Sequence, residues 1–458
     1  MKSIVAEHPS IALLKRVESI GFTRLHRRAR LIMGTATFFD AFDVLTIAYV
    51  MPVLIPIWHL GPRDIGLLIA ASFIGQIFGA IFFGWLAERI GRVPSAGITI
   101  AIMSIMGIGC GFAWSFQSLL FFRVLQGIGM GGEVPIAAAY INELCGAHKR
   151  GRFFLFYEAL FVLGLVGAAA MGTVLVPRFG WNVMFFVGAL PALGILLLIP
   201  SLKESPRWLI EKGRLSDAND IIQAFEKSGG IALTRHHGDS ENYKNVAPVS
   251  PANGKAEWKE LFSPQYRART FTVWGLWICV YFVNYGLNTW LPTVYNTVYG
   301  FSVSDSLRAG LLTNVSALVA VVVCATCIDR LGRKVWFLLG FLAAGIPLLI
   351  LGGSSSPPAL AVLALTTLSF AFVTTNSMVV YLYTPEIYPT RIRAVATGIA
   401  SSMLRIASAI GPIAVGFSLH AYGVHAVFLL FGIVSVIGAF FATRAVETRE
   451  KPLEEISL

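Results

Sequence analysis

Residues 84–92 have the sequence Gly-Trp-Leu-Ala-Glu-Arg-Ile-Gly-Arg, and residues 325–333 have the related sequence Ala-Thr-Cys-Ile-Asp-Arg-Leu-Gly-Arg. The two copies lie 241 residues apart. Each copy closes an apolar run with an acid and an Arg, which a Gly and a second Arg follow. We expect a helix to end in each copy, turn tightly and lead into the next helix, with Gly84 allowing another helix to approach closely.

A second motif is also duplicated. Tyr-Ile-Asn-Glu at residues 140–143 recurs as Tyr-Thr-Pro-Glu at residues 383–386, an offset of 243 residues. In both copies an Arg follows the Glu by seven residues, as Arg150 and Arg393. Two motifs with nearly one offset indicate that the chain consists of two halves with the same orientation. Parallel halves of this kind build transporters with a site at their interface, near the middle of the bilayer.

The composition excludes most other classes of protein. The chain has 458 residues, of which 56% are hydrophobic and 13% charged, whereas soluble domains carry about 25% charged residues. A dozen membrane helices of ~20 residues use ~240 residues, which the hydrophobic content supplies. Five Cys are too few for a secreted disulfide scaffold. The apolar runs are continuous, unlike the ~10-residue alternating segments of a transmembrane barrel.

The apolar runs predict an all-α membrane protein with twelve transmembrane helices in two six-helix halves. The spans are expected near residues 31–57, 63–87, 95–113, 118–143, 153–176, 181–200, 270–292, 306–328, 335–352, 358–384, 394–418 and 424–443. The corresponding regions are an N-terminal segment (1–30), a first bundle (31–200), a polar loop with short helices (201–268), a second bundle (269–443) and a tail (444–458).

Basic residues gather on one side of this topology. The even-numbered connections, the central loop and both ends are rich in Lys and Arg, while the odd-numbered connections hold little beyond Arg63 and Arg178. This positive-inside asymmetry places both termini in the cytoplasm. It also accounts for the net charge of +11 without nucleic acid as a partner. The expected location is the plasma membrane, in a bacterium the inner membrane.

The duplicated acids are candidates for a gate. An acid in each half can dock on the positive N-terminal end of a helix in the other half. We therefore expect Glu88 near Arg391 and Arg393, and Asp329 near Arg150 and Arg152. The full predicted gating set is Glu88, Arg92, Arg123, Glu143, Arg150, Asp329, Arg333, Glu386 and Arg393.

These motifs resemble the major facilitator superfamily over essentially the whole chain. Lys-Glu-Ser-Pro-Arg-Trp-Leu at 203–209, Glu-Ile-Tyr-Pro-Thr at 386–390 and Glu-Thr at 447–448 are similar to segments of sugar porters and organic-ion transporters. The family's first Asp is replaced by Glu88. The Gln pair of sugar porters is missing from the seventh span, which reads Phe-Val-Asn-Tyr-Gly-Leu-Asn at 282–288. That departure argues against a hexose as substrate.

Arg405 is the strongest signal of a substrate site. It lies about twelve residues into the eleventh predicted helix, where a charge costs ~2.5–3.5 kcal/mol on insertion scales. A guanidinium offers a planar fork of donors that matches a carboxylate. The alternative is a structural ion pair with Asp40 or another acid. The surrounding sequence resembles the eleventh helix of organic anion transporters, where an Arg stands at this place, and this resemblance implies an anionic substrate.

Three acids are candidates for proton coupling. Asp40 and Asp43 lie one turn apart on one face of the first helix, and Glu133 lies in the fourth. The Asp pair resembles that of niacin transporters and aromatic-acid/proton symporters. A carboxylate in an apolar site can take up and release a proton near neutral pH. The alternative is an acid that Arg123 holds permanently ionised.

Aromatic and amide side chains could complete a pocket for a flat ligand. The predicted substrate-binding set is Arg405, Asp40, Phe39, Tyr281, Asn284, Tyr285, Asn288, Trp290, Asn376 and Tyr381. Together these features predict a monomeric, proton-coupled importer of a small organic monocarboxylate, nicotinate-like or benzoate-like. The alternatives are a broader organic-ion or sugar-like carrier and a non-transporting receptor with the same fold.

The sequence gives little support to an enzyme. All eight His lie in loops, in tails or near the ends of spans, where they could not form a zinc site inside the membrane. Cys324-x-x-Cys327 has no further metal ligands nearby, and the chain has no nucleotide-binding loop of the Walker type. We therefore expect no metal and no cofactor.

Overall fold

The computed structural model describes residues 9–144, 150–230 and 258–449, and the regular secondary structure in this part of the chain is helical. Its elements are α1 (Pro9–Ser19), α2 (Arg24–Trp58), α3 (Pro62–Ile90), α4 (Arg92–Gly111), α5 (Phe116–Leu144), α6 (Arg150–Phe179), α7 (Asn182–Ile195), η2 (Ile199–Ser201), α8 (Pro206–Glu211), α9 (Leu215–Ser228), η3 (Trp258–Phe262), α11 (Arg267–Thr297), α12 (Val303–Leu331), α13 (Arg333–Gly353), α14 (Ala359–Glu386) and α15 (Thr390–Arg444). The predicted all-α class is confirmed.

Eleven helices in the described ranges are long and apolar enough to cross a membrane. The last of them, α15, consists of two helices that meet at Gly423, whose φ of 76° breaks the helical path. The sequence predicts a boundary between spans at this place. Helices suit a membrane because each satisfies its backbone hydrogen bonds internally, without water.

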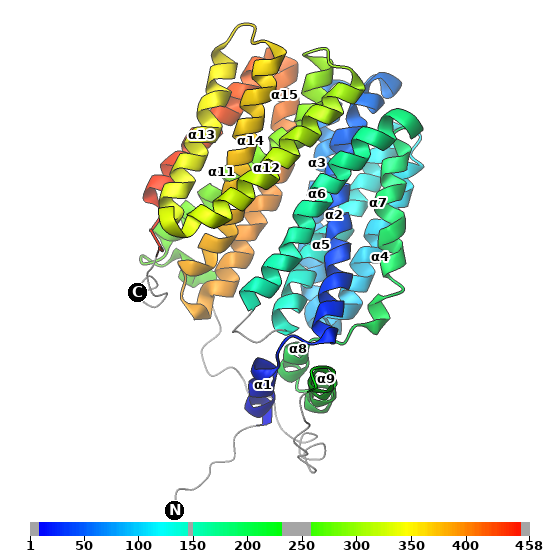
Figure 1. The fold of residues 1–458 in the computed structure, drawn as a ribbon, viewed down its shortest axis with the longest axis vertical. Helices are drawn as coiled ribbons and strands as arrows, with labels where there is room; N and C mark the ends of the chain where they lie inside the picture. Colours follow the sequence, from blue (N-terminus) through cyan, green and yellow to red (C-terminus); the bar gives the residue numbers. More distant parts are fainter. Residues whose placement is uncertain (1–8, 145–149, 231–257, 450–458) are drawn as a thin grey trace, which may run out of the picture.

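The helices form two groups that lie side by side (Figure 1). One group contains α2–α7 and the other α11–α15. The short helices α1, α8 and α9 lie together below the first group (Figure 1), around buried side chains that include Leu13, Trp208 and Ile222. We call the end of the molecule that carries α8 and α9 the basic end, and the opposite end the far end.

The Gly of the first duplicated motif makes the turn from one helix to the next. Gly91 separates α3 from α4 with φ 108°, and Gly332 separates α12 from α13 with φ 88°. L side chains rarely adopt this region of backbone conformation. A methyl group at Gly332 would also lie 2.6 Å from a carboxylate oxygen of Glu447. The motif therefore requires Gly for two reasons, backbone conformation and close approach.

Glycines also set the spacing between helices in the first group. The Cα atoms of Gly127 and Gly131 in α5 face the backbone of α3 at Ser72 and Gln76. Gly129 faces the backbone of α4 at Met103 and Thr99. Small residues at such crossings let backbones approach closely. This packing fixes the rotation of α5 and so decides where its two charged side chains point.

The two groups make close contact at the far end. A methyl group at Gly66 of α3 would lie 2.8 Å from the Pro412 carbonyl oxygen of α15. A methyl group at Gly416 would lie 2.5 Å from the Pro62 carbonyl oxygen. The Arg63 guanidinium lies over the Phe417 ring, 5.1 Å from its centre. These contacts hold α3 and α15 together at this end of the molecule.

The expectation that another helix approaches Gly84 is wrong for this conformation. Gly84 lies near the basic end of α3, and no atom of the described structure lies within 4 Å of the position that a methyl group would take there. Gly398, near the basic end of α15, has the same open space. Thus α3 and the first segment of α15 are in contact at the far end, while no described atom covers Gly84 or Gly398 at the basic end.

Candidate functional site

Arg405 brings the two halves together near the middle of the molecule. It projects from α15, and its Nη2 donates a hydrogen bond of 2.8 Å to the Gly131 carbonyl oxygen of α5. Its Nε is buried and has no hydrogen-bond partner in the described structure. Within the described ranges no carboxylate lies within 4.0 Å of its side-chain nitrogens. The ion pair that the sequence left open as an alternative is not formed in this conformation.

Asp40 is the acid that acts most directly on Arg405. Asp40 is 3% exposed, and its Oδ1 has no hydrogen-bond partner in the described structure. It interacts electrostatically with Glu133, Asp43 and Arg405. Asp40 and Arg405 are therefore near neighbours that attract each other without direct contact.

Glu133 is linked to α2 and α6 through the hydroxyl groups of Thr37 and Tyr157. The Thr37 hydroxyl donates to Glu133 Oε1 at 3.0 Å and lies 2.7 Å from the Tyr157 hydroxyl of α6. Thr37 stands three residues before Asp40, so both face the same side of α2. Nothing in the sequence singled out Thr37 and Tyr157, because a Thr and a Tyr in apolar helices give no signal of their own.

Asp43 and Arg123 are linked through a third side chain, Gln126. The Gln126 amide donates to Asp43 Oδ2 at 3.0 Å and accepts from Arg123 Nη1 at 2.9 Å. Arg123 also donates to the Asp43 backbone carbonyl at 3.3 Å and to the Ser72 hydroxyl at 2.9 Å. Asp43, Arg123 and Gln126 are fully buried. Gln126 therefore completes a network within the first half. Its position in the sequence, one helical turn after Arg123, could have indicated that the two side chains interact.

Four aromatic rings form a wall beside Arg405. Trp277, Tyr281 and Tyr285 of α11 stack in sequence, with ring centres 5.5 and 5.9 Å apart. The ring of Tyr381 from α14 meets the Trp277 ring edge-on at 4.6 Å. Both Tyr285 and Tyr381 interact electrostatically with Arg405. Phe73 of α3, in the other half, packs against Tyr285, and their ring centres are 5.0 Å apart.

Several predicted binding residues lie away from this wall. Asn376 is fully buried against α13, where its amide donates to the Phe337 carbonyl oxygen at 3.3 Å. Asn288 accepts a hydrogen bond of 3.1 Å from Asn314 of α12. Trp290 is buried at 1% exposure. The sequence identified these polar and aromatic types but could not tell which face of each helix turns toward the other half.

The remaining two members of the set lie closer to the site. Asn284 is on α11 between Tyr281 and Tyr285, and its amide donates to the Thr374 hydroxyl at 2.9 Å. Phe39 is next to Asp40 on α2, and its ring lies 6.3 Å from that of Phe42.

Three predicted gating residues of the first half, Glu88, Arg92 and Glu143, form a cluster at the basic end. The predicted gating role of Arg123 is not supported by its position, because Arg123 lies in the buried Gln126 network instead. Arg92 binds Glu143 at 2.9 Å and Glu88 at 2.7 Å. Glu204 caps the start of α4, accepting hydrogen bonds from the backbone N–H groups of Arg92 and Val93 at 3.0 and 3.2 Å. Burial raises the pKa of the Glu204 carboxyl, and backbone N–H donors oppose that shift.

The second half repeats this arrangement. Arg333 binds Glu386 at 3.0 Å. Glu447 caps the start of α13 by accepting from the backbone N–H groups of Arg333 and Lys334 at 2.9 and 3.0 Å. Glu204 and Glu447 are 243 residues apart, the offset of the duplicated Glu. The sequence pointed to all these segments, but the capping role needed the structure.

The predicted contact of Glu88 with Arg393 is not formed in this conformation, and the side chains of Arg152 and Arg391 lie outside the described part of the chain. The described partners of Glu88 are Arg92 and Lys212, the latter at 3.9 Å, and both belong to the first half or its following helices. Arg393 donates to the Tyr388 carbonyl oxygen at 3.2 Å. The side chains of Arg150 and Asp329 lie outside the described part of the chain. The cross-half contact stays a prediction for the state in which the basic ends meet.

Comparison with known proteins identifies the family. The family described as "Sugar (and other) transporter" matches residues 61–458. A niacin transporter, NiaP, of Acinetobacter baylyi is 33% identical over 449 residues, which cover 97% of this chain and 100% of that protein. The chain belongs to the sugar (and other) transporter family. It is therefore a multi-pass membrane transporter of the major facilitator superfamily, as its motifs indicated, and not an enzyme.

Further relatives and solved structures agree with this assignment. A putative niacin/nicotinamide transporter of Bacillus subtilis is 31% identical to this transporter, covering 84% of this chain and 86% of that protein. The partially occluded inward-open xylose transporter XylE from E. coli aligns with a TM-score of 0.72 and 20% identity, over 93% of this chain and 99% of that chain. A D-xylose–proton symporter aligns over the same shares with a TM-score of 0.74. At 20% identity these structures establish the fold.

Replacing Gln126 tests whether the buried network stabilises the fold. Gln126→Leu removes the link between Arg123 and Asp43 and leaves polar atoms of both without that partner in a buried position. Each buried unsatisfied group costs about 1–3 kcal/mol, more when charged. We expect a clear loss of thermal stability in detergent, measured by the unfolding midpoint.

Gln76→Leu is the matched control, because Gln76 is a buried Gln of α3 whose Nε2 has no hydrogen-bond partner in the described structure. It should cost much less. Equal losses of stability in the two variants would contradict the assigned role of Gln126.

Proposed function

We propose that this transporter imports a small organic monocarboxylate, aromatic or heteroaromatic, together with a proton. In this proposal it acts as a monomer with twelve spans, α15 counting as two, and its segment 201–268 connects two six-helix halves. The basic end faces the cytoplasm, in keeping with the positive-inside rule. The observation that carries the proposal is the Arg405 guanidinium between the halves, which has no carboxylate partner within the described ranges.

Arg405 is arranged to receive a carboxylate. One nitrogen is held by the Gly131 carbonyl oxygen, which orients the guanidinium plane, and the buried Nε has no partner in the described structure. A bidentate carboxylate would satisfy a cation that is otherwise costly at this depth. A neutral substrate would leave that charge without a counterion. A carboxylate is therefore the substrate group that best fits this position.

The aromatic wall favours a flat ligand attached to that carboxylate. Trp277, Tyr281 and Tyr285 present parallel rings, with Tyr381 edge-on to two of them. Offset and edge-on ring contacts are each worth about 0.5–1.5 kcal/mol beyond the buried area. Two relatives carry niacin in their names, and nicotinate is a heteroaromatic monocarboxylate. Nicotinate is accordingly the first substrate to test.

A sugar-like carrier is the second candidate, since the family description and the xylose-transporter structures include sugars. Sugars bind through many hydroxyl contacts. Here the amides of Asn284 and Asn288 take part in hydrogen bonds within the second half, so they are less available to a sugar. Binding assays with D-xylose and nicotinate separate the two candidates directly.

The first functional prediction concerns Arg405. Purified protein should be stabilised against heat by nicotinate or benzoate and not by nicotinamide, which has the same ring without the carboxylate. A ligand at 100 times its Kd adds about 2.7 kcal/mol of stability. Arg405→Lys keeps the charge and loses the bidentate fork, so we expect the Kd for the carboxylate to rise more than tenfold. Wild-type affinity in a folded Arg405→Lys variant would contradict the assignment.

The acids around Arg405 suggest how a proton is coupled to the substrate. Asp40 is attracted by Arg405 and repelled by Glu133 and Asp43. A carboxylate bound to Arg405 would neutralise that cation and add another negative charge nearby. Asp40 would then take up a proton more readily, so the anion and the proton would load together.

The second functional prediction therefore concerns Asp40. Asp40→Asn mimics the protonated state, and in proteoliposomes it should still exchange labelled substrate while losing accumulation driven by a pH gradient. Asp43→Asn is the control, because Asp43 lies in the Gln126 network. It should lower stability or overall rate and keep the pH dependence. Accumulation that survives in Asp40→Asn would mean that the proton travels through another group, with Glu133 next in line.

The spacing of glycines in α3 and α15 suggests how access alternates. Gly66 and Gly84 are 18 residues apart in α3, and Gly398 and Gly416 are 18 residues apart in α15. Eighteen residues are five helical turns of 3.6, so each pair shares a helix face. Gly66 and Gly416 pack across the halves at the far end, while Gly84 and Gly398 are uncovered. The second pair would pack when the basic ends close.

The third functional prediction tests this alternation. A Gly84→Cys/Gly398→Cys double variant on a background without other Cys should cross-link only when the basic ends meet. Cross-linking should be slow in detergent and should block transport once formed. Gly180→Cys/Gly398→Cys, which places one thiol at the far end, is the control and should not cross-link. Absence of any Gly84–Gly398 cross-link during turnover would rule out this contact.

A further inference from the structure

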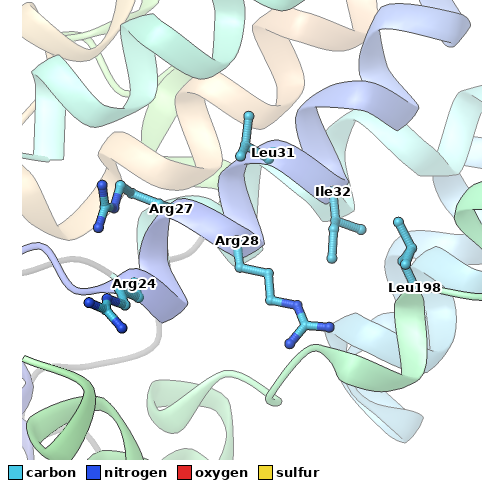
Figure 2. Close-up of a pocket in the computed structure, with 6 residues that line it drawn as sticks. All are labelled: Arg24, Arg27, Arg28, Leu31, Ile32 and Leu198. Carbon is cyan, nitrogen blue, oxygen red and sulfur yellow. The ribbon is translucent and has the colours of Figure 1, made fainter.

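A groove of about 460 Å³ lies at the basic end of the first half, away from the substrate site. It is lined by Arg24, Arg27, Arg28, Leu31 and Ile32 of α2 and by Leu198, between α7 and η2. Figure 2 shows the three arginines spreading from the first turns of α2, with Ile32 directed toward Leu198. None of these residues belongs to the gate or to the predicted substrate pocket.

The three arginines have no counterions in the described part of the chain. All three side chains are exposed, and within the described ranges none takes part in a hydrogen bond or an ion pair. They stand at positions i, i+3 and i+4 of one helix, where like charges repel. Other arginines at this end are paired, as Arg92 and Arg333 are. A concentration of unpaired positive charge on one groove calls for an anion from outside the chain.

The apolar part of the groove favours an amphipathic anion over a small water-soluble one. Leu31 is 61% exposed and Leu198 46% exposed, and the adjacent Leu197 is 85% exposed. Leu31 follows Arg27 by four residues, and Ile32 follows Arg28 by four residues. Each apolar side chain is therefore about one helical turn, ~6 Å, further along α2 than an arginine on the same face. A phospholipid has the same arrangement, with a charged phosphate at one depth and apolar acyl chains deeper in the membrane.

We propose that this groove binds an anionic phospholipid such as phosphatidylglycerol. The lipid phosphate lies among Arg24, Arg27 and Arg28, and an acyl chain lies along Leu31, Ile32 and Leu198. A zwitterionic lipid fits less well, because its ammonium group would face three guanidinium groups. The lipid would contact both α2, which carries Asp40, and the end of α7. It would therefore hold two helices of the first half together at the membrane surface.

Native mass spectrometry of the full chain in detergent tests the proposal. Phosphatidylglycerol, phosphatidylcholine and inorganic phosphate are titrated separately, and the Kd of the first bound molecule is measured. An arginine near a membrane surface contributes about 1 kcal/mol to anionic-lipid binding, so Arg28→Gln should raise the Kd for phosphatidylglycerol about fivefold. The Arg24→Gln/Arg27→Gln/Arg28→Gln variant should raise it more than tenfold.

The control removes the same number of charges elsewhere on the exposed surface. Arg214→Gln/Lys227→Gln/Arg444→Gln should leave the Kd within twofold of wild type. Phosphatidylcholine should bind at least tenfold more weakly than phosphatidylglycerol, and inorganic phosphate should not displace the lipid. The proposal is overturned if the groove variants bind phosphatidylglycerol like wild type, if both lipids bind equally, or if phosphate competes on equal terms. Because lipid binding is read directly, this result is independent of the transport assays.

Discussion

The central constraint on this transporter is the positive charge of Arg405, which lies between the two halves without an ion pair to a carboxylate in the described structure. Arg405 comes from the second half, and its hydrogen bond ends on a backbone carbonyl of the first half, at Gly131. Within the described ranges, no carboxylate lies in ion-pair distance of it, although Asp40 is close enough to attract it. A strong ion pair would fix the two halves together. A hydrogen bond to a neutral carbonyl leaves the charge of Arg405 unneutralised, which is what the proposed binding of a substrate carboxylate requires.

The glycines of α5 make this contact possible. Gly127 and Gly131 bring α5 against the backbone of α3, and the same rotation of α5 buries Arg123 and Glu133 inside the first half. Arg123 is then satisfied by Gln126, Ser72 and the Asp43 carbonyl. Two arginines at membrane depth thus have different surroundings. Arg123 lies in a closed network of one half, and Arg405 lies at the boundary between halves.

The duplicated motifs show how a repeated sequence becomes a repeated structure. In each half an Arg at the start of a helix binds the Glu of the second motif, and a Glu 243 residues from its counterpart caps that helix. Tyr140 and Tyr383 also hold the chain that leads to the capping Glu, through Lys203 and Val446. Each cluster lies within one half. The two clusters can therefore move relative to each other while each stays intact.

The sequence by itself determined the helical membrane fold, the duplication and the identity of the charged residues, because length, hydropathy and motif offset are properties of the chain alone. It singled out Arg405, Asp40 and the gating pairs for the same reason. Only the tertiary structure decided that Asn376 faces α13, that Gln126 stands between Arg123 and Asp43, and that Glu88 binds Arg92. Those outcomes depend on the rotation of each helix and on which ends of the two halves are in contact. Packing between helices sets both, and no local pattern in the sequence records them.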